Sequence, residues 1–225
     1  MNEQMPAVSV VIPTLNEAAR LPATLAALGG LPGEIVVADG GSTDATAAVA
    51  RAHGARMVAA PRGRGAQLAA GVAAAGGEWL LLLHADTRLG PGWGAATQAL
   101  MAGGTARAGY FRFTLASAAA AARRRERAVA WRCRVLGLPY GDQGLLLARR
   151  LLAEVGGLRP LPLMEDVDLV RRLGRRRLAA LDAPALTSAE RWERDGWTRR
   201  SARNLACLGL FAAGLPPRVI ARLYS

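Results

Sequence analysis

The segment VSVVIPTLNE (residues 8–17) decides the fold, because it joins a short run of apolar, mostly β-branched residues to a polar turn. A continuous apolar run of this length is typical of a strand buried on both faces of a parallel sheet. The pattern returns in EIVVADGGSTDAT (residues 34–46) and EWLLLLHADT (residues 78–87). Because helical stretches separate these runs, the sequence predicts an α/β protein with a mostly parallel sheet and helices on both faces.

The alternation of short apolar runs and Ala-rich stretches continues along the chain. We expect strands at residues 8–12, 35–38, 56–59, 79–83, 110–115 and 178–181, and a further short apolar run at 145–148. We expect helices at residues 17–28, 44–53, 67–75, 93–101, 117–136 and 198–215, and one that opens near Glu165. No stretch reads as a long linker, so we predict one domain over residues 1–225 with a C-terminal helical region.

The charge of the chain narrows its chemistry. The 225 residues carry a formal net charge of +12, and all 29 basic residues are arginine. The absence of lysine excludes Schiff-base chemistry, pyridoxal-phosphate binding and a lysine-containing phosphate-binding P-loop. Residues 1–100 hold 6 arginines against 7 acids (net −1), whereas residues 101–225 hold 23 against 10 (net +13). The basic half indicates either GC-rich coding with solvated arginines or a surface for phosphates, nucleic acid or an anionic membrane.

The cysteines and the apolar stretches bear on where the protein works. Cys133 and Cys207 lie far apart and lack metal-ligand spacing, which favours a reduced, cytoplasmic protein. The longest uncharged stretch near the C-terminus, residues 204–217, is shorter than the about 20 apolar residues that cross a bilayer. We therefore expect membrane contact, where it occurs, to be peripheral and at the inner face of the membrane.

Polar side chains gather where three predicted strands end, at residues 13–17, 39–44 and 84–87. Ligands of open α/β sheets bind beyond the carboxyl ends of the strands, so these side chains should converge on one pocket. Ser42 and Thr43 have an alternative interpretation as helix caps. A carboxylate that ends a buried strand needs a partner, which a ligand or metal ion can supply.

Taken together, VSVVIPTLNE, EIVVADGGSTDAT, EWLLLLHADT and MEDVDL (residues 164–169) resemble family 2 glycosyltransferases with the GT-A fold. The resemblance covers about residues 7–175 and implies a nucleotide-sugar-binding half at about 1–115 and an acceptor-binding half at about 116–225. It further implies that Thr14 and Glu17 line the nucleoside site and that Asp39 contacts the base.

The resemblance also implies a divalent metal cofactor, Mn²⁺ or Mg²⁺. Asp86 matches the last acid of the family's Asp-x-Asp motif, which binds a metal that bridges the donor diphosphate. Oxygen ligands suit these ions, and a metal shared with phosphates needs only one or two protein carboxylates. His84 stands where the first acid is usual, so it is either a ligand or donor contact, or a histidine bonded to backbone. Arg64 is either a phosphate contact or a solvated loop charge.

The Glu165–Asp166 pair carries the predicted chemistry of transfer. In the family the second acid of this pair is the catalytic base, which points to Asp166, and Glu165 is placed beside the acceptor or diphosphate. An acceptor hydroxyl must lose its proton while it attacks the anomeric carbon opposite the leaving diphosphate, which inverts that carbon. Glu165 and Asp168 have the alternative role of favouring a helix N-terminus.

Two later motifs, GDQG (residues 141–144) and RWERDGW (residues 191–197), resemble those of a small bacterial subgroup without transmembrane helices. They imply that Asp142 and Gln143 line the acceptor pocket, although a plain turn is an alternative. They also imply that Arg191 and Trp192 lie beside the acceptor or diphosphate, because arginine binds phosphate and an aromatic ring stacks on a sugar.

The sequence as a whole predicts an inverting, metal-dependent glycosyltransferase that uses a UDP- or GDP-sugar. The acceptor stays open between a lipid-linked phosphate, a carotenoid or terpenoid hydroxyl and a small soluble alcohol. A sugar nucleotidyltransferase is an alternative, but such enzymes carry a Gly-rich, usually lysine-containing N-terminal loop that this chain lacks. A non-enzymatic protein that binds nucleic acid or a membrane surface is a second alternative; aromatics make up only 5% of the chain, which disfavours nucleic acid.

Overall fold

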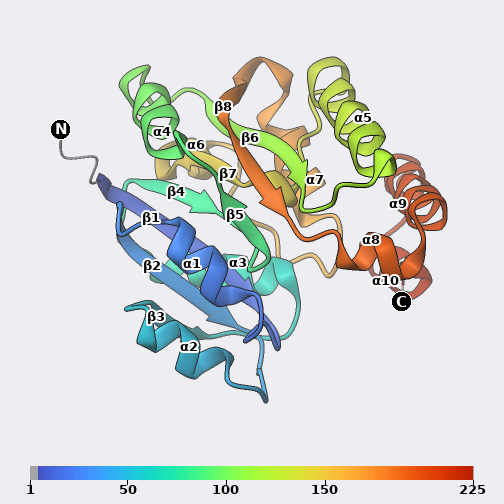
Figure 1. Cartoon of the computed structure of the whole chain (residues 1–225). Coiled ribbons are helices and arrows are strands. Elements are labelled where there is room, and N and C mark those ends of the chain that lie inside the picture. Colours follow the sequence, from blue (N-terminus) through green and yellow to red (C-terminus); the bar gives the residue numbers. More distant parts are fainter. Residues whose placement is uncertain (1–4, 225) are drawn as a thin grey trace.

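The computed structural model describes residues 5–224, and its centre is one eight-stranded sheet (Figure 1). The strand order across the sheet is β3-β2-β1-β4-β7-β6-β8-β5. The strands are β1 (Met5–Thr14), β2 (Pro32–Asp39), β3 (Arg56–Ala59), β4 (Trp79–Leu82), β5 (Thr87–Leu89), β6 (Ala108–Leu115), β7 (Leu145–Ala148) and β8 (Leu178–Thr187). Both halves of the chain therefore contribute to a single sheet.

The N-terminal half of the sheet is parallel, as the apolar runs predict. β1 lies between β2 and β4 and pairs with both in parallel, and β2 pairs in parallel with β3. Val10, Val11 and Ile12 have no exposed surface, and helix α3 (Arg64–Ala74) packs against β1. Burial of continuous apolar strands on both faces is what an α/β sheet requires.

The C-terminal half of the sheet is mixed. β7 is antiparallel to both of its neighbours, β4 and β6, and β6 is parallel to β8. The short strand β5 pairs antiparallel with the end of β8. Four of the seven strand pairings are thus parallel, and the inserted β7 reverses direction between two parallel groups.

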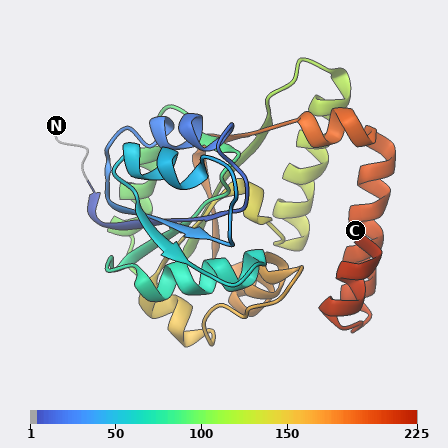
Figure 2. The same ribbon diagram turned by 90° about the horizontal axis from the view of Figure 1, so that it is seen from below.

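Helices lie on both faces of the sheet, as predicted: Figure 2 shows α1 and α2 on one side and α3 and α6 on the other. The helices before residue 140 are α1 (Leu21–Ala27), α2 (Thr46–Ala52), α3 (Arg64–Ala74), α4 (Trp93–Ala102) and α5 (Ala120–Leu136). The later ones are α6 (Arg149–Glu154), α7 (Glu165–Leu173), α8 (Glu190–Asp195), α9 (Trp197–Ala212) and α10 (Pro217–Tyr224), with 3-10 turns η1 (Gly141–Gln143) and η2 (Arg175–Arg177).

The C-terminal helices α9 and α10 lie beside α5, away from the sheet (Figures 1 and 2). A small apolar cluster joins α5, the end of β6 and α8, and it includes Phe113, Val129, Cys133 and Trp192. The main core lies along the sheet and is separate from this cluster. Within residues 5–224, no helix is long and apolar enough to span a membrane.

Candidate active site

One edge of the sheet collects the polar residues of both halves of the chain. The strands β1, β2 and β4 are mutually parallel, so they end at this edge. Because β7 is antiparallel to β4, it begins there, with Leu145 opposite Leu82. β8 runs in the direction of β4 and brings Thr187 to the same edge, opposite Thr87. The topology therefore brings the His84, η1 and Ser188 segments together.

A cavity of about 150 Å³, partly open to solvent, lies at this edge. Seven predicted site residues line it: Arg64, His84, Asp86, Asp142, Asp166, Arg191 and Trp192. The remaining lining residues are Tyr140, Leu163, Met164, Val167, Thr187, Ser188, Arg200 and Asn204. The cavity thus combines three carboxylates with three guanidinium groups.

Asp166 is held rigidly at the start of α7. Its Oδ2 accepts a hydrogen bond of 2.8 Å from the Gly141 amide, and its Oδ1 accepts one of 2.8 Å from the amide of Val167. Burial by itself raises the pKa of Asp166, but the charge of Arg64 and the hydrogen bond from Gly141 outweigh it and hold the pKa below its usual value. The carboxylate is therefore ionised at neutral pH and can accept a proton.

The backbone turn before Asp166 is strained. Met164 has a φ of 65°, a left-handed conformation that L-residues adopt at a cost of about 1–2 kcal/mol. Such strain is characteristic of functional sites, where surrounding contacts enforce it. Met164 lines the cavity and immediately precedes the acidic pair. The two acids face different surroundings, because Asp166 lines the cavity and Glu165 does not.

Glu165 is buried and pairs with Arg64, the first residue of α3. Arg64 Nε donates to Glu165 Oε1, and the Glu165 side chain is 1% exposed. Burial raises the pKa of Glu165, although the charge of Arg64 opposes that shift. The pair holds Arg64 at the cavity wall, and Asp166 is the member of the acidic pair that lines the cavity.

His84 and Asp86 follow β4 and differ sharply in environment. Burial and the charge of Arg64 lower the pKa of His84 to about 4, so its imidazole is neutral at pH 7. Its Nε2 is buried and has no hydrogen-bond partner among residues 5–224. The atom lies against Gly141, where an added Cβ would come within 2.6 Å of it. No described group donates a hydrogen bond to the Asp86 carboxylate, which also lines an adjoining pocket beside α1 and α8.

This donor set fits a divalent metal that shares its coordination with a diphosphate. No group of three or more His, Cys, Asp or Glu side chains that could hold a metal ion occurs in the described part of the chain. Asp86 offers carboxylate oxygens, and the unpartnered Nε2 of neutral His84 is the kind of nitrogen that Mn²⁺ accepts. One or two protein ligands suffice when phosphate oxygens complete the shell.

Asp142 of η1 is a third carboxylate in the cavity. Its Oδ1 is buried without a partner in the described chain, and its main-chain oxygen accepts a hydrogen bond of 3.0 Å from Thr187. Burial raises the pKa of Asp142 to about 6, against the opposing charge of Arg132. A buried carboxylate with an unmet acceptor is a candidate for a ligand contact.

Because its pKa is raised, ionised Asp142 lowers the free energy of unfolding above pH 6. The folded protein binds more protons than the unfolded chain between the usual value of 3.8 and about 6, so stability falls as the pH rises through that window. The difference corresponds to about 3 kcal/mol. We expect D142N to be more stable than the parent by up to this amount at pH 8, with equal stability near pH 4. Urea unfolding at both pH values measures this, and equal stability at pH 8 would contradict it.

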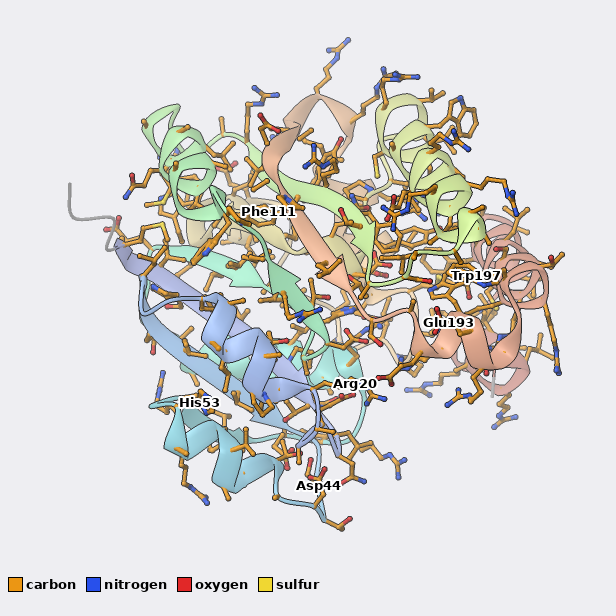
Figure 3. The ribbon with its side chains drawn as sticks, viewed as in Figure 1. Arg20, Asp44, His53, Phe111, Glu193 and Trp197 are labelled. Carbon is orange, nitrogen blue, oxygen red and sulfur yellow. The ribbon has the colours of Figure 1, made fainter. Side chains whose placement is uncertain are left out.

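An ion-pair network joins the β1–α1 turn to α8. Arg20, which is labelled in Figure 3, donates to Glu17 Oε2 at 3.2 Å and to Glu190 Oε2 at 2.6 Å. Arg191 lies 3.7 Å from Glu17 Oε1, and burial raises the pKa of Glu17. Glu17 does not line the cavity itself, but it pairs with Arg191, which does.

Asp39 and Thr14 lie at the ends of β2 and β1, outside the lining of the cavity. Thr14 Oγ1 donates to Asp39 at 3.0 Å, and Asp39 also accepts hydrogen bonds from the Ser42 hydroxyl and from the Gly41 and Ser42 amides. Burial raises the pKa of Asp39, but the bonds from Ser42 outweigh it and the pKa is low. Ser42 thus orders the loop through Asp39 and Asn16 and does not cap α2.

Gln143 does not reach the cavity. Its Nε2 donates to the Phe111 carbonyl at 3.0 Å, and its Oε1 accepts from the Tyr140 amide and from Cys133. The side chain is buried and both ends of its amide are bonded, so its contacts hold η1 against β6 and α5.

Trp192 is largely buried beneath the cavity wall. It stacks on Trp197 with ring centroids 5.9 Å apart (Trp197 is labelled in Figure 3). The guanidinium of Arg125 lies 4.7 Å from the Trp192 ring centroid and that of Arg200 lies 5.3 Å away. Cation–π contacts therefore already engage the ring, and the edge that remains lines the cavity.

Sequence reasoning missed several lining residues. No recognised motif includes Tyr140, Thr187, Ser188 or Asn204. Arg200 was interpreted as one of several arginines on an exposed helix face. Tyr140 immediately precedes the GDQG motif, and Arg200 and Asn204 lie one turn apart on α9, so their spacing offered a weak signal. Arg200 and Asn204 line the cavity from α9, and Thr187 and Ser188 line it from the end of β8, because the tertiary fold places these segments beside it, which no local pattern indicates.

The fold and the cavity together define a class of protein. The fold of this chain is similar to that of glucosyl-3-phosphoglycerate synthase from Mycobacterium tuberculosis. Its structure with Mn²⁺ and UDP-glucose matches with a TM-score of 0.58 and 22% identity over 93% of this chain and 79% of that one. A complex with Mn²⁺, UDP and glucosyl-3-phosphoglycerate matches with a TM-score of 0.55 and 23% identity over 80% and 70%. The class is therefore the GT-A fold.

The family follows from the sequence match. The model of glycosyl transferase family 2 matches residues 9–127, more than half of the chain, and the chain belongs to this family. Uncharacterized glycosyltransferases of Mycobacterium tuberculosis and Mycobacterium bovis are 46% identical over 87 residues. That match spans 38% of this chain and 39% of each relative, so it covers well under two thirds of their length.

Proposed function

We propose that this protein is an inverting, metal-assisted glycosyltransferase that moves a sugar from a nucleotide-sugar to an acceptor hydroxyl. The observation that carries the proposal is that an ionised Asp166 lines the same cavity as Asp86, whose carboxylate accepts no hydrogen bond from the described residues. The first suits proton removal and the second suits metal binding. Membership of family 2 supports the same chemistry.

On the donor side, Asp86 would hold the metal, with His84 Nε2 as a second ligand. When bound, Mn²⁺ or Mg²⁺ would stabilise the negative charge that develops on the leaving nucleoside diphosphate. Arg64, anchored by Glu165, and Arg191, anchored by Glu17, would bind phosphate oxygens from the cavity wall. Asp39 and Thr14 would shape the nucleoside pocket at the neighbouring strand ends.

On the acceptor side, Asp166 would take the proton of the attacking hydroxyl. The bonds from Gly141 and Val167 fix its carboxylate, so little reorganisation is needed during the reaction. A single base and in-line attack opposite the diphosphate give inversion. Asp142, with its unmet Oδ1, would accept a hydrogen bond from the acceptor.

The donor we propose for the first assay is UDP-glucose, because the synthase of the same fold binds it with Mn²⁺. GDP-sugars stay an alternative, since a carboxylate such as Asp39 accepts an N–H from uracil and guanine alike. Location in the cytoplasm and contact with an anionic membrane surface also stay predictions. Exposed apolar side chains, including Trp131 on α5 and Leu205 on α9, support the predicted contact with a membrane surface.

The proposal is tested by incubating the protein with a panel of nucleotide-sugars and measuring nucleoside diphosphate release, with Mn²⁺ or with a chelator. We expect release with one donor, and only with metal present. Pyrophosphate release from a nucleoside triphosphate and a sugar phosphate would instead identify a nucleotidyltransferase. Binding to nucleic acid with a steep salt dependence and no turnover would overturn both enzymatic interpretations.

A further inference from the structure

The α8–α9 junction forms an arginine-lined groove next to the cavity. Five arginines and one acid line it: Arg191, Arg194, Asp195, Arg199, Arg200 and Arg203. The groove is continuous with the active-site cavity, because Arg191 and Arg200 line both. We propose that this groove binds the phosphate group of a phosphorylated acceptor and so directs the acceptor's hydroxyl toward Asp166.

The charge within the groove is poorly balanced. Asp195 accepts from Arg194 at 2.9 Å, from Arg200 at 2.8 Å and from Arg203 at 3.4 Å, so one carboxylate serves three guanidinium groups. Arg199 is exposed and has no ion pair with any residue between 5 and 224. The lining residues carry five positive charges and one negative charge, and Glu17, outside the lining, also pairs with Arg191 at 3.7 Å. A bound dianion would relieve this repulsion.

The arginines also stand at the unfavourable end of a helix. α9 is 16 residues long and has no acid in its first turn, whereas Arg199, Arg200 and Arg203 lie in its first two turns. The N-terminus of a helix carries a partial positive charge and unpaired amides, so basic residues are disfavoured there and anions are favoured. The helix end and the guanidinium groups therefore attract the same kind of ligand.

A buried donor at the shared wall points to a ligand as well. Arg200 Nε is buried without a hydrogen-bond partner in the described structure, and its side chain is only 11% exposed. A buried donor without a partner is costly unless a ligand or water completes it. Arginine forks bind both phosphate and carboxylate oxygens in a bidentate manner, but a phosphomonoester dianion offsets more of the excess positive charge than a singly charged carboxylate does.

Binding of an anion in the groove does not require a bound nucleotide-sugar. The role of that anion as the sugar acceptor rests on the proposed transferase function. A small soluble phosphomonoester and a phosphomonoester lipid headgroup present the same chemistry. Glycerol 3-phosphate and vesicles of phosphatidylcholine with phosphatidic acid represent the two sources. Glycerol and pure phosphatidylcholine vesicles are their uncharged or zwitterionic counterparts.

The test uses R194Q/R199Q, because neither residue lines the active-site cavity. The control is R218Q/R222Q, which removes the same charge from exposed positions on α10. Calorimetry at constant ionic strength measures glycerol 3-phosphate, glycerol and acetate, and flotation measures the vesicles. We expect the parent to bind one or both phosphomonoester probes, R194Q/R199Q to bind them at least tenfold more weakly, and the control to stay within twofold.

Equal binding by R194Q/R199Q and the parent would overturn the inference, as would an equal loss in the control or equal binding of acetate. With UDP-glucose and Mn²⁺, glycerol 3-phosphate should stimulate UDP release more than glycerol does, and this stimulation should fall in R194Q/R199Q. If the parent binds phosphomonoester but no nucleotide-sugar, the groove stands and the proposed function fails. If it binds nucleotide-sugar but no phosphomonoester, the groove proposal alone fails.

Discussion

D166N should lower the rate of sugar transfer by about 10²–10⁴-fold, the usual contribution of a positioned general base. The asparagine amide cannot take the proton of an acceptor hydroxyl at neutral pH. Donor binding should persist, because the metal and phosphate contacts proposed above lie on Asp86, Arg64 and Arg191. Single-turnover rates with saturating donor, together with calorimetric titration of the nucleotide-sugar, measure the two effects separately.

The matched control is D168N, the same change two residues along the helix. Asp168 pairs with Arg159 at 3.0 Å and with Arg172 at 2.7 Å and lies outside the cavity lining, so its loss should lower stability and leave turnover per folded molecule unchanged. D166N also loses one of two backbone hydrogen bonds, so its unfolding midpoint should be recorded. Retained turnover, or lost donor binding with unchanged chemistry per bound donor, would show that Asp166 is not the base.

D86A should weaken metal-dependent donor binding by more than about 100-fold. Loss of a residue that only hydrogen-bonds a metal ligand already lowers metal affinity by about 10–100-fold, and a ligand itself should matter more. The Asp86 carboxylate is the proposed metal ligand, and His84 alone offers one neutral nitrogen. The expected signature is a parent whose nucleotide-sugar affinity rises with Mn²⁺ and a variant whose affinity does not respond to Mn²⁺. Calorimetry with Mn²⁺ and with a chelator gives the comparison.

D182A serves as the control for D86A, because Asp182 is fully exposed, pairs with Arg112 at 4.0 Å and does not line the cavity. It should keep the full response to Mn²⁺. A D86A protein that keeps a Mn²⁺-dependent gain in affinity would rule out Asp86 as a necessary ligand. H84A then reports on the second ligand: a smaller response to Mn²⁺ is expected if the unpartnered Nε2 coordinates the ion.

Long, apolar elements could be predicted from the sequence with useful accuracy. The strands predicted at 56–59 and 79–83 correspond to β3 (Arg56–Ala59) and β4 (Trp79–Leu82), and the apolar run at 145–148 forms β7 (Leu145–Ala148). The short β5 (Thr87–Leu89) escaped prediction, because three residues carry no period and the strand exists by pairing with β8, a hundred residues away. α10 was missed although Pro217 opens it, a common first helical residue.

Site residues near strand ends were easier to predict than those elsewhere. His84 and Asp86 line the cavity as expected, because the end of a buried parallel strand has one direction to face. Gln143 and Asp142 are neighbours in one motif, yet Asp142 lines the cavity and Gln143 faces the core. The orientation of each side chain depends on how η1 packs on Phe111 and Cys133, and the local sequence does not specify that packing.

The sequence by itself determined the parallel β1–β4 core, the family and the identity of the strand-end carboxylates, because these depend on local apolar runs and short motifs. Only the tertiary structure decided that β7 enters antiparallel beside β4, which brings Asp142 and Asp166 to the edge that holds Asp86. It also decided which of the 29 arginines face the cavity. The local sequence does not distinguish an arginine that faces the cavity from one that faces solvent, because the neighbours of an arginine in space come from distant segments.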